Sequence, residues 1–357
     1  MEENRKQTFS YKKAFYALII SLIVIFAILA FLGENVDLSL VLKLSPSWII
    51  GTISIYMLAQ SINALRTKLL LKSYGINLPY KEAFANILLM QFFNNLTPFA
   101  AGGQPYQVYD LSKRGVETTT AAAVVVSRYV VNNVAILILA LIFLPKYWNA
   151  FLKIPGIGIF ASLGALMTIA LLIFLVTLSY SKKMLIRSLD IFLKPTFIRK
   201  LLGKSLDCEP DEVREYLIKK FEEFNYYMKL IWKKGPHNMF IDIALSILFS
   251  VVFKFIMYFV LMGLLGVSQV TSSVSFLEVW GVQELLFLVA FYVPTPGASG
   301  ALELGLFYML GGVLPKGVIG IAVALWRLLT YHFMIVLGTV IFLARQKRIA
   351  NKKNRGN

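Results

Sequence analysis

Long apolar runs separated by short polar stretches dominate the chain, and their lengths predict helices that cross a membrane. A helix needs about 20 mostly apolar residues to span a bilayer. Six runs approach or exceed that length, and they are Ala14–Leu32, Trp48–Leu70, Thr118–Leu144, Gly156–Leu178, Met239–Leu265 and Gly317–Ala344. A cleaved signal peptide is the alternative for the first run, which however is longer than a usual signal core and lacks small residues at its end. We therefore expect six full spans.

Two further apolar stretches are interrupted by proline and glycine. Ala83–Leu111 is broken around Asn94–Pro98, and Phe276–Leu310 is broken around Pro294–Gly300. Closely spaced prolines and glycines end helices, and exposed backbone is very costly in lipid. Each stretch is therefore expected to form a re-entrant hairpin of two half-helices with its tip covered by protein, and a kinked full span is the alternative. The fold class predicted is all-α and polytopic.

Composition agrees with a membrane protein. Of the 357 residues, 58% are hydrophobic and only 15% are charged, which argues against a soluble globular protein. The 27 Phe and 17 Tyr argue against disorder. A single cysteine, Cys208, excludes an internal disulfide and a cysteine-based metal cluster, and two histidines make a His-rich site a poor expectation. We expect no metal and no cofactor.

The placement of the basic residues predicts the orientation. If both hairpins return to their own side, both termini are cytoplasmic and 29 of the 36 Lys and Arg face the cytoplasm, as the positive-inside rule requires. The net charge of +17 is then explained by the basic residues on the cytoplasmic side of the spans. The location predicted is a cell (inner) membrane, which the chain crosses several times. Nucleic acid is a poor alternative partner, because the basic residues line every cytoplasmic edge. Three cations, Arg128, Lys254 and Arg327, remain inside predicted spans.

Residues 181–236 form a cytoplasmic insert with 13 basic and 8 acidic residues. Apolar residues recur in it at helical spacing after Pro210-Asp211, and they are Val213, Leu217, Phe221, Phe224, Met228 and Ile231. An earlier piece, Leu185–Leu202, mixes apolar with basic residues. Both are expected to be amphipathic helices that lie on the anionic lipids of the inner leaflet or over the bundle.

The two broken stretches resemble each other. Thr97–Gly102 matches Thr295–Gly300 at Thr, Pro, Ala and Gly, and Arg128 and Arg327 follow the two threonines by 31 and 32 residues. We predict one membrane domain, 1–357, with an inverted repeat of 47–145 and 238–344 whose hairpins are 82–112 and 276–312. Interrupted helices at corresponding places in inverted halves indicate a transport site near the bilayer midplane.

Arg128 and Arg327 are the leading candidates for function. Each costs about 2.5 to 3.5 kcal/mol at the centre of a membrane helix, so both should face the interior. They suit binding of an anionic group such as a phosphate. The alternative is that each arginine pairs with a buried carboxylate or with hairpin carbonyls and only holds the fold.

The hairpin tips supply a second anion-binding element. A half-helix that starts near Gly103–Pro105 or Gly300–Ala301 directs N–H groups and a positive dipole end toward the midplane. Close packing through small residues is the alternative role of these glycines. The predicted substrate site includes Glu303 and the tip residues Thr97, Gly102, Gly103, Gln104, Thr295, Gly297 and Gly300.

Four further charged residues complete the set. Glu303, in the first turn of the second half-helix, is expected to cap that helix or to pair with an arginine, and coupling to a proton or cation is the less favoured role. Glu284, Lys254 and Asp110 are secondary or coupling candidates. Lys254 either faces the cavity or snorkels, and Asp110 is at its simplest an interfacial residue. Arg66 is interpreted as an anchor at the cytoplasmic interface.

At these motifs the chain resembles the flippase-like transmembrane family typified by the membrane half of lysylphosphatidylglycerol synthases. The resemblance lies in Asn95–Gln104, in Pro294–Glu303 and in the helix Trp326–Tyr331, and it covers essentially the whole chain. The usual pattern has a second glycine where this sequence has Ala298. The resemblance implies lipid translocation.

In the full synthases a soluble domain transfers lysine to the lipid. Here the chain ends 13 residues after Ala344 and the insert is too small for such a domain, so lysyl transfer is not expected. The function predicted is a lipid flippase for an anionic phospholipid or a polyprenyl-phosphate-linked headgroup, and not an enzyme. A lipid-modifying membrane enzyme and a non-catalytic membrane scaffold are the alternatives.

Overall fold

The structure is a computed structural model that describes residues 39–152, 181–206, 209–290, 293 and 295–355, with isolated positions in 19–26 and 164–177. Within these residues every regular element is a helix. The all-α prediction is therefore confirmed for this part of the chain. The predicted spans Ala14–Leu32 and Gly156–Leu178 lie outside the described residues, apart from those isolated positions.

The other four predicted spans are confirmed as long apolar helices. They are α3 (Pro46–Lys72), α6 (Thr118–Leu152), α11 (Pro236–Leu265) and a continuous stretch at Gly317–Lys347. Counting the bent pair of α12 (Val267–Ser273) and α13 (Phe276–Ala290), which meet at 67°, as one span gives a fifth among the described residues. The chain is thus a helical membrane protein with several spans.

The last span contains an irregular turn. It is built from α15 (Lys316–Arg327), the π-helical turn η1 (Leu328–His332) and α16 (Phe333–Arg355). Single π turns inside α-helices are frequent at functional sites. Here the turn follows Arg327 directly, so it rotates the arginine relative to the rest of the span.

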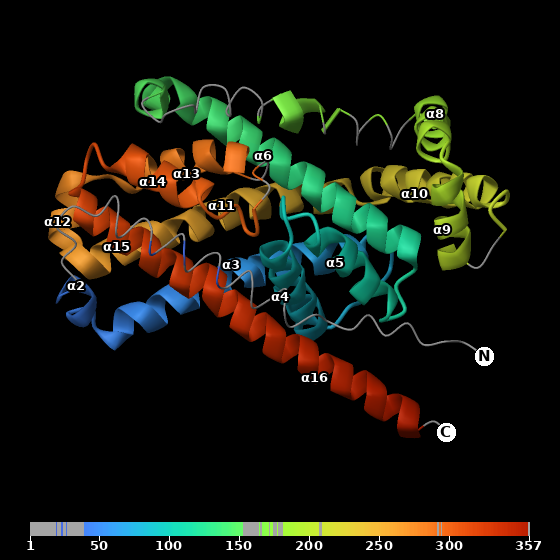
Figure 1. The fold of residues 1–357 in the computed structure, drawn as a ribbon, viewed down its shortest axis with the longest axis horizontal. Helices are drawn as coiled ribbons and strands as arrows, with labels where there is room; N and C mark the ends of the chain where they lie inside the picture. The colour runs from blue at the N-terminus through green and yellow to red at the C-terminus, as the bar shows by residue number, and fades with distance from the viewer. Residues whose placement is uncertain are drawn as a thin grey trace.

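Both interrupted stretches form pairs of packed helices. α4 (Tyr80–Leu96) packs against α5 (Gly103–Ser112), and α13 packs against α14 (Ala301–Leu310). α4 also packs against α16, and α13 packs against α6, so each pair is held by the other half of the chain (Figure 1).

The two breaks meet each other. An isolated antiparallel β-bridge pairs Pro98 in the first break with Pro296 in the second. Phe99, Ala100 and Ala298 have φ of 56°, 49° and 56°, in the left-handed region that non-glycine residues rarely enter. Backbone strain of this kind concentrates at functional sites, so the two breaks joined at Pro98 and Pro296 are a candidate functional site.

The insert forms three helices rather than two. They are α8 (Lys182–Phe192), α9 (Thr196–Leu206) and α10 (Val213–Lys234). The predicted single piece Leu185–Leu202 is divided because Pro195 cannot continue a helix. α10 packs on α6 and α11, so it lies over the bundle. Figure 1 shows α8 to α10 and the last turns of α16 toward one end of the long axis, with α2 (Ser39–Leu42) and α12 at the other.

Two apolar cores hold this arrangement. The larger one mixes both halves and includes the fully buried Phe92 of α4, Leu306 of α14 and Trp326 of α15. A smaller one joins α3, α4 and α5 to the insert through residues such as Leu70 and Ile231. The polar site described below lies beside the larger core.

Candidate functional site

A cavity of about 580 Å³ lies between the two halves at the joined tips. Its walls come from α3, α4, α5, α6, α11, α13, α14, the last span and both breaks. The predicted site residues that line it are Arg128, Arg327, Gln104, Gly297 and Lys254. The predicted site residues that do not line it are Thr97, Gly102, Gly103, Thr295, Gly300, Glu303, Glu284 and Asp110.

Arg128 of α6 is the cation that best fits an anion-binding role. Its side chain is buried, and its Nη1 and Nη2 donate to Thr67 Oγ1 at 2.6 Å and to Asn63 Oδ1 at 3.1 Å. Among the described residues, no carboxylate lies within 4.0 Å of this guanidinium. A buried charge held only by neutral groups is costly, so Arg128 favours an anion beside it.

Arg66, one turn from Asn63 on α3, differs from Arg128 because it has a carboxylate partner. It was expected to anchor the chain at the interface, and that interpretation is wrong, because its side chain is only 1% exposed. Its Nε and Nη2 donate to the two carboxylate oxygens of Asp242 at 2.8 and 3.3 Å, and its Nη1 donates to Asn63 Oδ1 at 3.2 Å. Asp242 therefore neutralises Arg66, while Asn63 contacts both arginines.

Arg327 pairs with a buried carboxylate and with backbone carbonyls, as expected if it holds the fold rather than a ligand. Its Nε lies 2.7 Å from Glu303 Oε1, and its Nη2 donates to the carbonyl oxygens of Gly297 at 3.1 Å and Ala298 at 3.4 Å. Glu303, which is fully buried, accepts the backbone N–H of Gly300 at 2.8 Å. Arg327 and Glu303 thus lock the second tip, with the arginine also forming part of the cavity wall.

The N–H groups that were expected to face a ligand are engaged inside the hairpins. Gly102 N donates to Thr97 Oγ1 at 2.8 Å, and Gly103 N donates to Asn94 Oδ1 at 2.9 Å. A Cβ on Gly103 would lie 2.4 Å from the carbonyl oxygen of Met90, so this glycine permits close packing of α5 on α4. The second break is closed similarly, by Thr295 Oγ1 donating to Ser299 O at 2.8 Å.

Lys254 of α11 is a second buried cation on the cavity wall. Its side chain is 3% exposed, and its ammonium lies 3.3 Å from the centroid of the Phe287 ring. Within the described part of the chain, no carboxylate comes within 4.0 Å of this ammonium. Glu284 lies behind the wall, where it accepts from Trp280 Nε1 at 2.8 Å and contacts Ser250.

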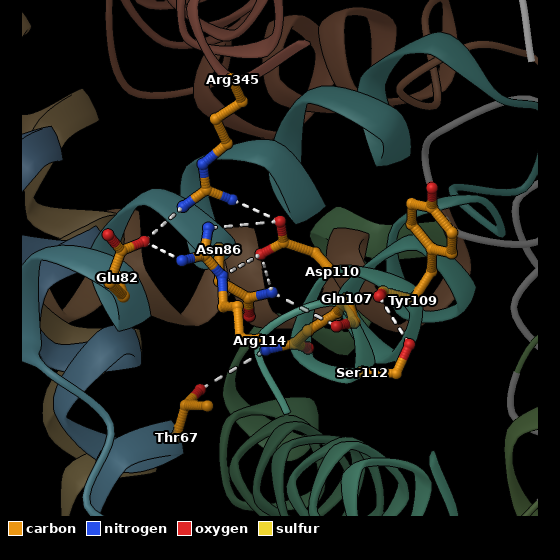
Figure 2. Close-up of polar contacts among 9 residues, drawn as sticks. All are labelled: Thr67, Glu82, Asn86, Gln107, Tyr109, Asp110, Ser112, Arg114 and Arg345. Carbon is orange, nitrogen blue, oxygen red and sulfur yellow. Dashed lines mark hydrogen bonds and ion pairs between the residues drawn. The ribbon is translucent and has the colours of Figure 1, made fainter. Parts of the chain in front are cut away.

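Asp110 belongs to an ion cluster outside the cavity, which Figure 2 shows. We call the group formed by Glu82, Asp110, Arg114 and Arg345 the α5–α16 cluster. Asp110 accepts from Arg345 Nη1 at 2.5 Å, from Arg114 Nε at 3.1 Å and from Asn86 Nδ2 at 2.7 Å. Glu82 contacts Arg114 and lies 3.4 Å from Arg345 Nη2. The cluster joins α4 and α5 to the middle of α16.

Sequence reasoning missed the residues that hold Arg128. Asn63, Arg66 and Thr67 lie three and four residues apart on α3, so they share one face of an otherwise apolar helix. That spacing could have indicated a polar face of α3 directed toward the protein interior. Asp242, the partner of Arg66, was not detectable in the same way because it comes from a helix 176 residues further along the chain.

Comparisons with known proteins find similarity along nearly the whole chain. Residues 15–338 match the family described as the lysylphosphatidylglycerol synthase TM region. A UPF0104 membrane protein of Archaeoglobus fulgidus is 27% identical over 285 residues, which cover 78% of this chain and 80% of the relative. A UPF0104 membrane protein of Methanocaldococcus jannaschii is 24% identical over 96% of this chain and 98% of its own length. A UPF0104 membrane protein of Pyrococcus horikoshii is 23% identical over 95% of this chain and 99% of its own length.

Proposed function

The chain belongs to the family of the lysylphosphatidylglycerol synthase transmembrane region, and on that premise we propose that it is a lipid flippase. Its cargo is an anionic phospholipid or a polyprenyl-phosphate-linked headgroup, which it moves between leaflets. One observation carries the proposal: Arg128 is buried on the wall of a 580 Å³ cavity and has no carboxylate within 4.0 Å among the described residues. A phosphate bound there supplies the missing negative charge.

The proposed architecture is that of an inverted-repeat transporter. Six full spans and the re-entrant hairpins 82–112 and 276–312 form two halves, 47–145 and 238–344, and both termini face the cytoplasm of the cell. The meeting of the two breaks at Pro98 and Pro296 supports this arrangement. Binding sites of such transporters lie near the midplane between the repeats.

The headgroup travels through the cavity while the hydrocarbon tail stays in the surrounding lipid. The phosphate exchanges its hydration for the guanidinium of Arg128, so the protein lowers the cost of dehydration. Arg327 and Glu303 keep the second tip in shape during this passage. Rocking of one repeat against the other opens the cavity to each leaflet in turn. The insert 181–236 rests near anionic lipids of the inner leaflet.

A lipid-modifying enzyme remains the alternative function, because the family takes its name from a synthase. We propose transport without covalent chemistry. Lipid recovered after incubation with the protein and candidate donors should keep its mass, and a mass increase detected by mass spectrometry would favour the enzyme. A purely structural membrane scaffold is opposed by the buried cation and its polar cavity, which a scaffold does not need.

Proteoliposomes test the proposal directly. A fluorescent anionic phospholipid is placed in both leaflets, and its arrival in the outer leaflet is followed by chemical quenching. Arg128→Gln keeps hydrogen-bonding capacity but removes the charge, so movement should fall about 10- to 100-fold, as expected for loss of a charge-assisted bond. Arg214→Gln is the matched control, because Arg214 is exposed and pairs with Asp190 in the insert. Equal rates for wild type and Arg128→Gln with every lipid tried would refute the site.

A further inference from the structure

We propose that transport is coupled to protons and that Glu284 of α13 is the residue that carries the proton. A proton on Glu284 leaves the ammonium of Lys254 without a counter-charge, so an anion binds in the cavity, and the anion and the proton cross the membrane together. The coupling rests on the proposed function for the transport step alone. The linkage between proton and anion comes from the side chains themselves.

Glu284 is a buried carboxyl group without a cation beside it. Its side chain is fully buried, and within the described part of the chain no Lys or Arg nitrogen lies within 4.0 Å of it. Trp280 Nε1 donates to its Oε1 at 2.8 Å and Ser250 Oγ donates to the same oxygen, while Oε2 has no partner among the described residues. A carboxylate in such a place is costly when charged, and protonation removes that cost. Ionisable groups of this kind inside membrane proteins mark proton pathways.

The other buried carboxylates are held by arginines. Four carboxylate residues are buried in the described ranges, and three of them, Asp110, Asp242 and Glu303, lie in ion pairs with Arg345, Arg66 and Arg327. An arginine at that distance favours the charged form of its partner. Glu284, the fourth, is therefore the buried carboxyl group best able to gain and lose a proton during a transport cycle.

Ser250 of α11 connects Glu284 to the cavity. Ser250 lines the cavity and its hydroxyl donates to the carboxylate, whereas Glu284 itself does not line it. A proton from cavity water binds to the hydroxyl oxygen as the hydroxyl's own proton passes to the carboxylate. Glu284 thereby gains one proton, and Ser250 ends as it began.

The charge of Glu284 acts on Lys254, which lines the same part of the cavity. α11 and α13 pack side by side (Figure 1), and Lys254 lies one turn after Ser250. Gln283 donates to the carbonyl oxygen of Lys254 at 3.0 Å, and the ammonium lies over the ring of Phe287, one turn further along α13. Charges that are close together in a low-dielectric interior interact strongly. An ionised Glu284 therefore balances Lys254, and a protonated one leaves the ammonium to attract an anion.

Other groups near α13 are not expected to take part. The charged or titratable side chains on the neighbouring stretches of the packed helices are Lys254 and Tyr258 on α11, Lys146 and Tyr147 on α6, and Glu303 and Tyr308 on α14. Glu303 pairs with Arg327, and Lys146 lies 3.9 Å from Glu278 at the start of α13. Tyrosines are ordinarily neutral up to about pH 10. Of these described groups, Glu284 and Lys254 are left to respond to the contents of the cavity.

This linkage fixes the direction of coupling. If a proton on Glu284 strengthens the binding of an anion, the anion strengthens the binding of the proton by the same factor. Each cycle then carries one proton with one negative charge, so no net charge crosses the membrane. Because protons run from the acidic to the alkaline side, a pH gradient should accumulate the anion on the alkaline side.

Binding tests the linkage. The probe is fluorescent phosphatidylglycerol, which carries one negative charge, and its affinity for the purified full chain in detergent is measured at pH 5.5 and pH 8. Wild type should bind at least about fivefold more tightly at the lower pH. Glu284→Gln keeps an acceptor for Ser250 and Trp280 but fixes the neutral form, so it should bind tightly at both pH values.

Two further variants complete the binding experiment. Lys254→Met should bind weakly at both pH values, which gives an independent result if Glu284→Gln does not fold. Glu278→Gln is the matched control on the same helix, because Glu278 accepts the N–H of Ser275 at 2.8 Å outside the cavity, and it should behave as wild type does. The same pH dependence in wild type, Glu284→Gln and Lys254→Met would overturn the assignment of the proton to Glu284.

Proteoliposomes test the coupling. The same lipid is placed in both leaflets, a gradient of about one pH unit is imposed, and protein-free vesicles under that gradient give the blank. With one proton for each anion, wild type should approach a ratio of up to about ten in favour of the alkaline leaflet. Glu284→Gln should still move the lipid but leave it evenly distributed. An ionophore that removes the gradient should abolish the enrichment.

The outcomes separate the coupling from the proposed function. Movement of lipid by wild type without any response to the gradient would keep the flippase and overturn the coupling. Binding that depends on pH through Glu284, with no movement of lipid at any pH, would remove the flippase and keep Glu284 as a proton site linked to the anion.

Discussion

The guanidinium of Arg345 lies 2.5 Å from the carboxylate of Asp110, a residue 235 positions earlier in the chain. This ion pair fastens the middle of α16 to α5, so the last helix of the described chain is attached to the second helix of the first interrupted stretch (Figure 2). The side chains are 14% and 9% exposed, which places the pair between a surface and a buried salt bridge. Its contribution to stability should therefore be measurable.

Arg345→Gln and Asp110→Asn should each lower the free energy of unfolding by about 1 to 3 kcal/mol, because hydrogen bonds to charged groups are lost. The double variant should lose less than the sum of the two single variants, by at least about 0.5 kcal/mol. Unfolding followed by tryptophan fluorescence in detergent gives the values. Arg199→Gln, at an exposed pair with Asp211, is the control and should change little. Strict additivity would show that Arg345 and Asp110 do not act together.

Glu303→Gln should be among the most destabilising single substitutions in the chain. It leaves Arg327 buried without its carboxylate, and breaking a buried ion pair costs about 3 to 5 kcal/mol. Glu303→Leu combined with Arg327→Leu removes both charges and should recover part of that loss. Thermal unfolding in detergent measures both variants. A double variant no more stable than Glu303→Gln would contradict the role of Arg327 in locking the tip.

Adjacent substitutions in the second break should have opposite effects. A Cβ on Gly297 would lie 2.2 Å from the ring of Tyr331, whose hydroxyl donates to Asn95 O at 3.0 Å. Gly297→Ala should displace Tyr331 and loosen the contact between the halves, with a loss of more than about 2 kcal/mol. Ala298→Gly should be neutral or stabilise by up to about 1 kcal/mol, because φ is 56° there and glycine adopts that conformation without strain. Similar unfolding temperatures for the two variants would contradict the assigned conformations.

Acid should loosen the attachment of the insert to the membrane domain. Thr119 and then Tyr227 donate hydrogen bonds to Glu117, and they lower the pKa of its carboxyl below the ordinary value of 4.5. A lowered folded-state pKa contributes stability that is present above the unfolded pKa and is lost as pH falls through the folded value. As pH falls below the ordinary value of 4.5, α10 should exchange its amide hydrogens progressively faster, after correction for the intrinsic rate. Glu117→Gln should flatten this dependence, and an unchanged profile would assign it to another group.

The helices could be predicted from the sequence, but the side chains that contact each buried arginine could not. α3, α6 and α11 are predictable because apolar length alone identifies a span, and the two breaks are predictable because proline and glycine end helices. The division of labour between Arg128 and Arg327 is not predictable. Their sequence contexts are alike, and only tertiary packing brings Glu303 to one and Asn63 with Thr67 to the other. Arg66 was misplaced for the same reason, since its carboxylate partner lies on a distant helix.

The bridge between Pro98 and Pro296 has a consequence for how the protein is made. The first hairpin leaves the ribosome about 200 residues before its bridge partner exists, and unpaired backbone groups at its tip cost several kcal/mol each in lipid. Until the second hairpin arrives, the first tip has to remain hydrated or shielded by the insertion machinery. For the proposed re-entrant topology we therefore predict that the two halves integrate into the membrane together. A truncated first half should be degraded in cells, and co-expression of the second half as a separate chain should restore it.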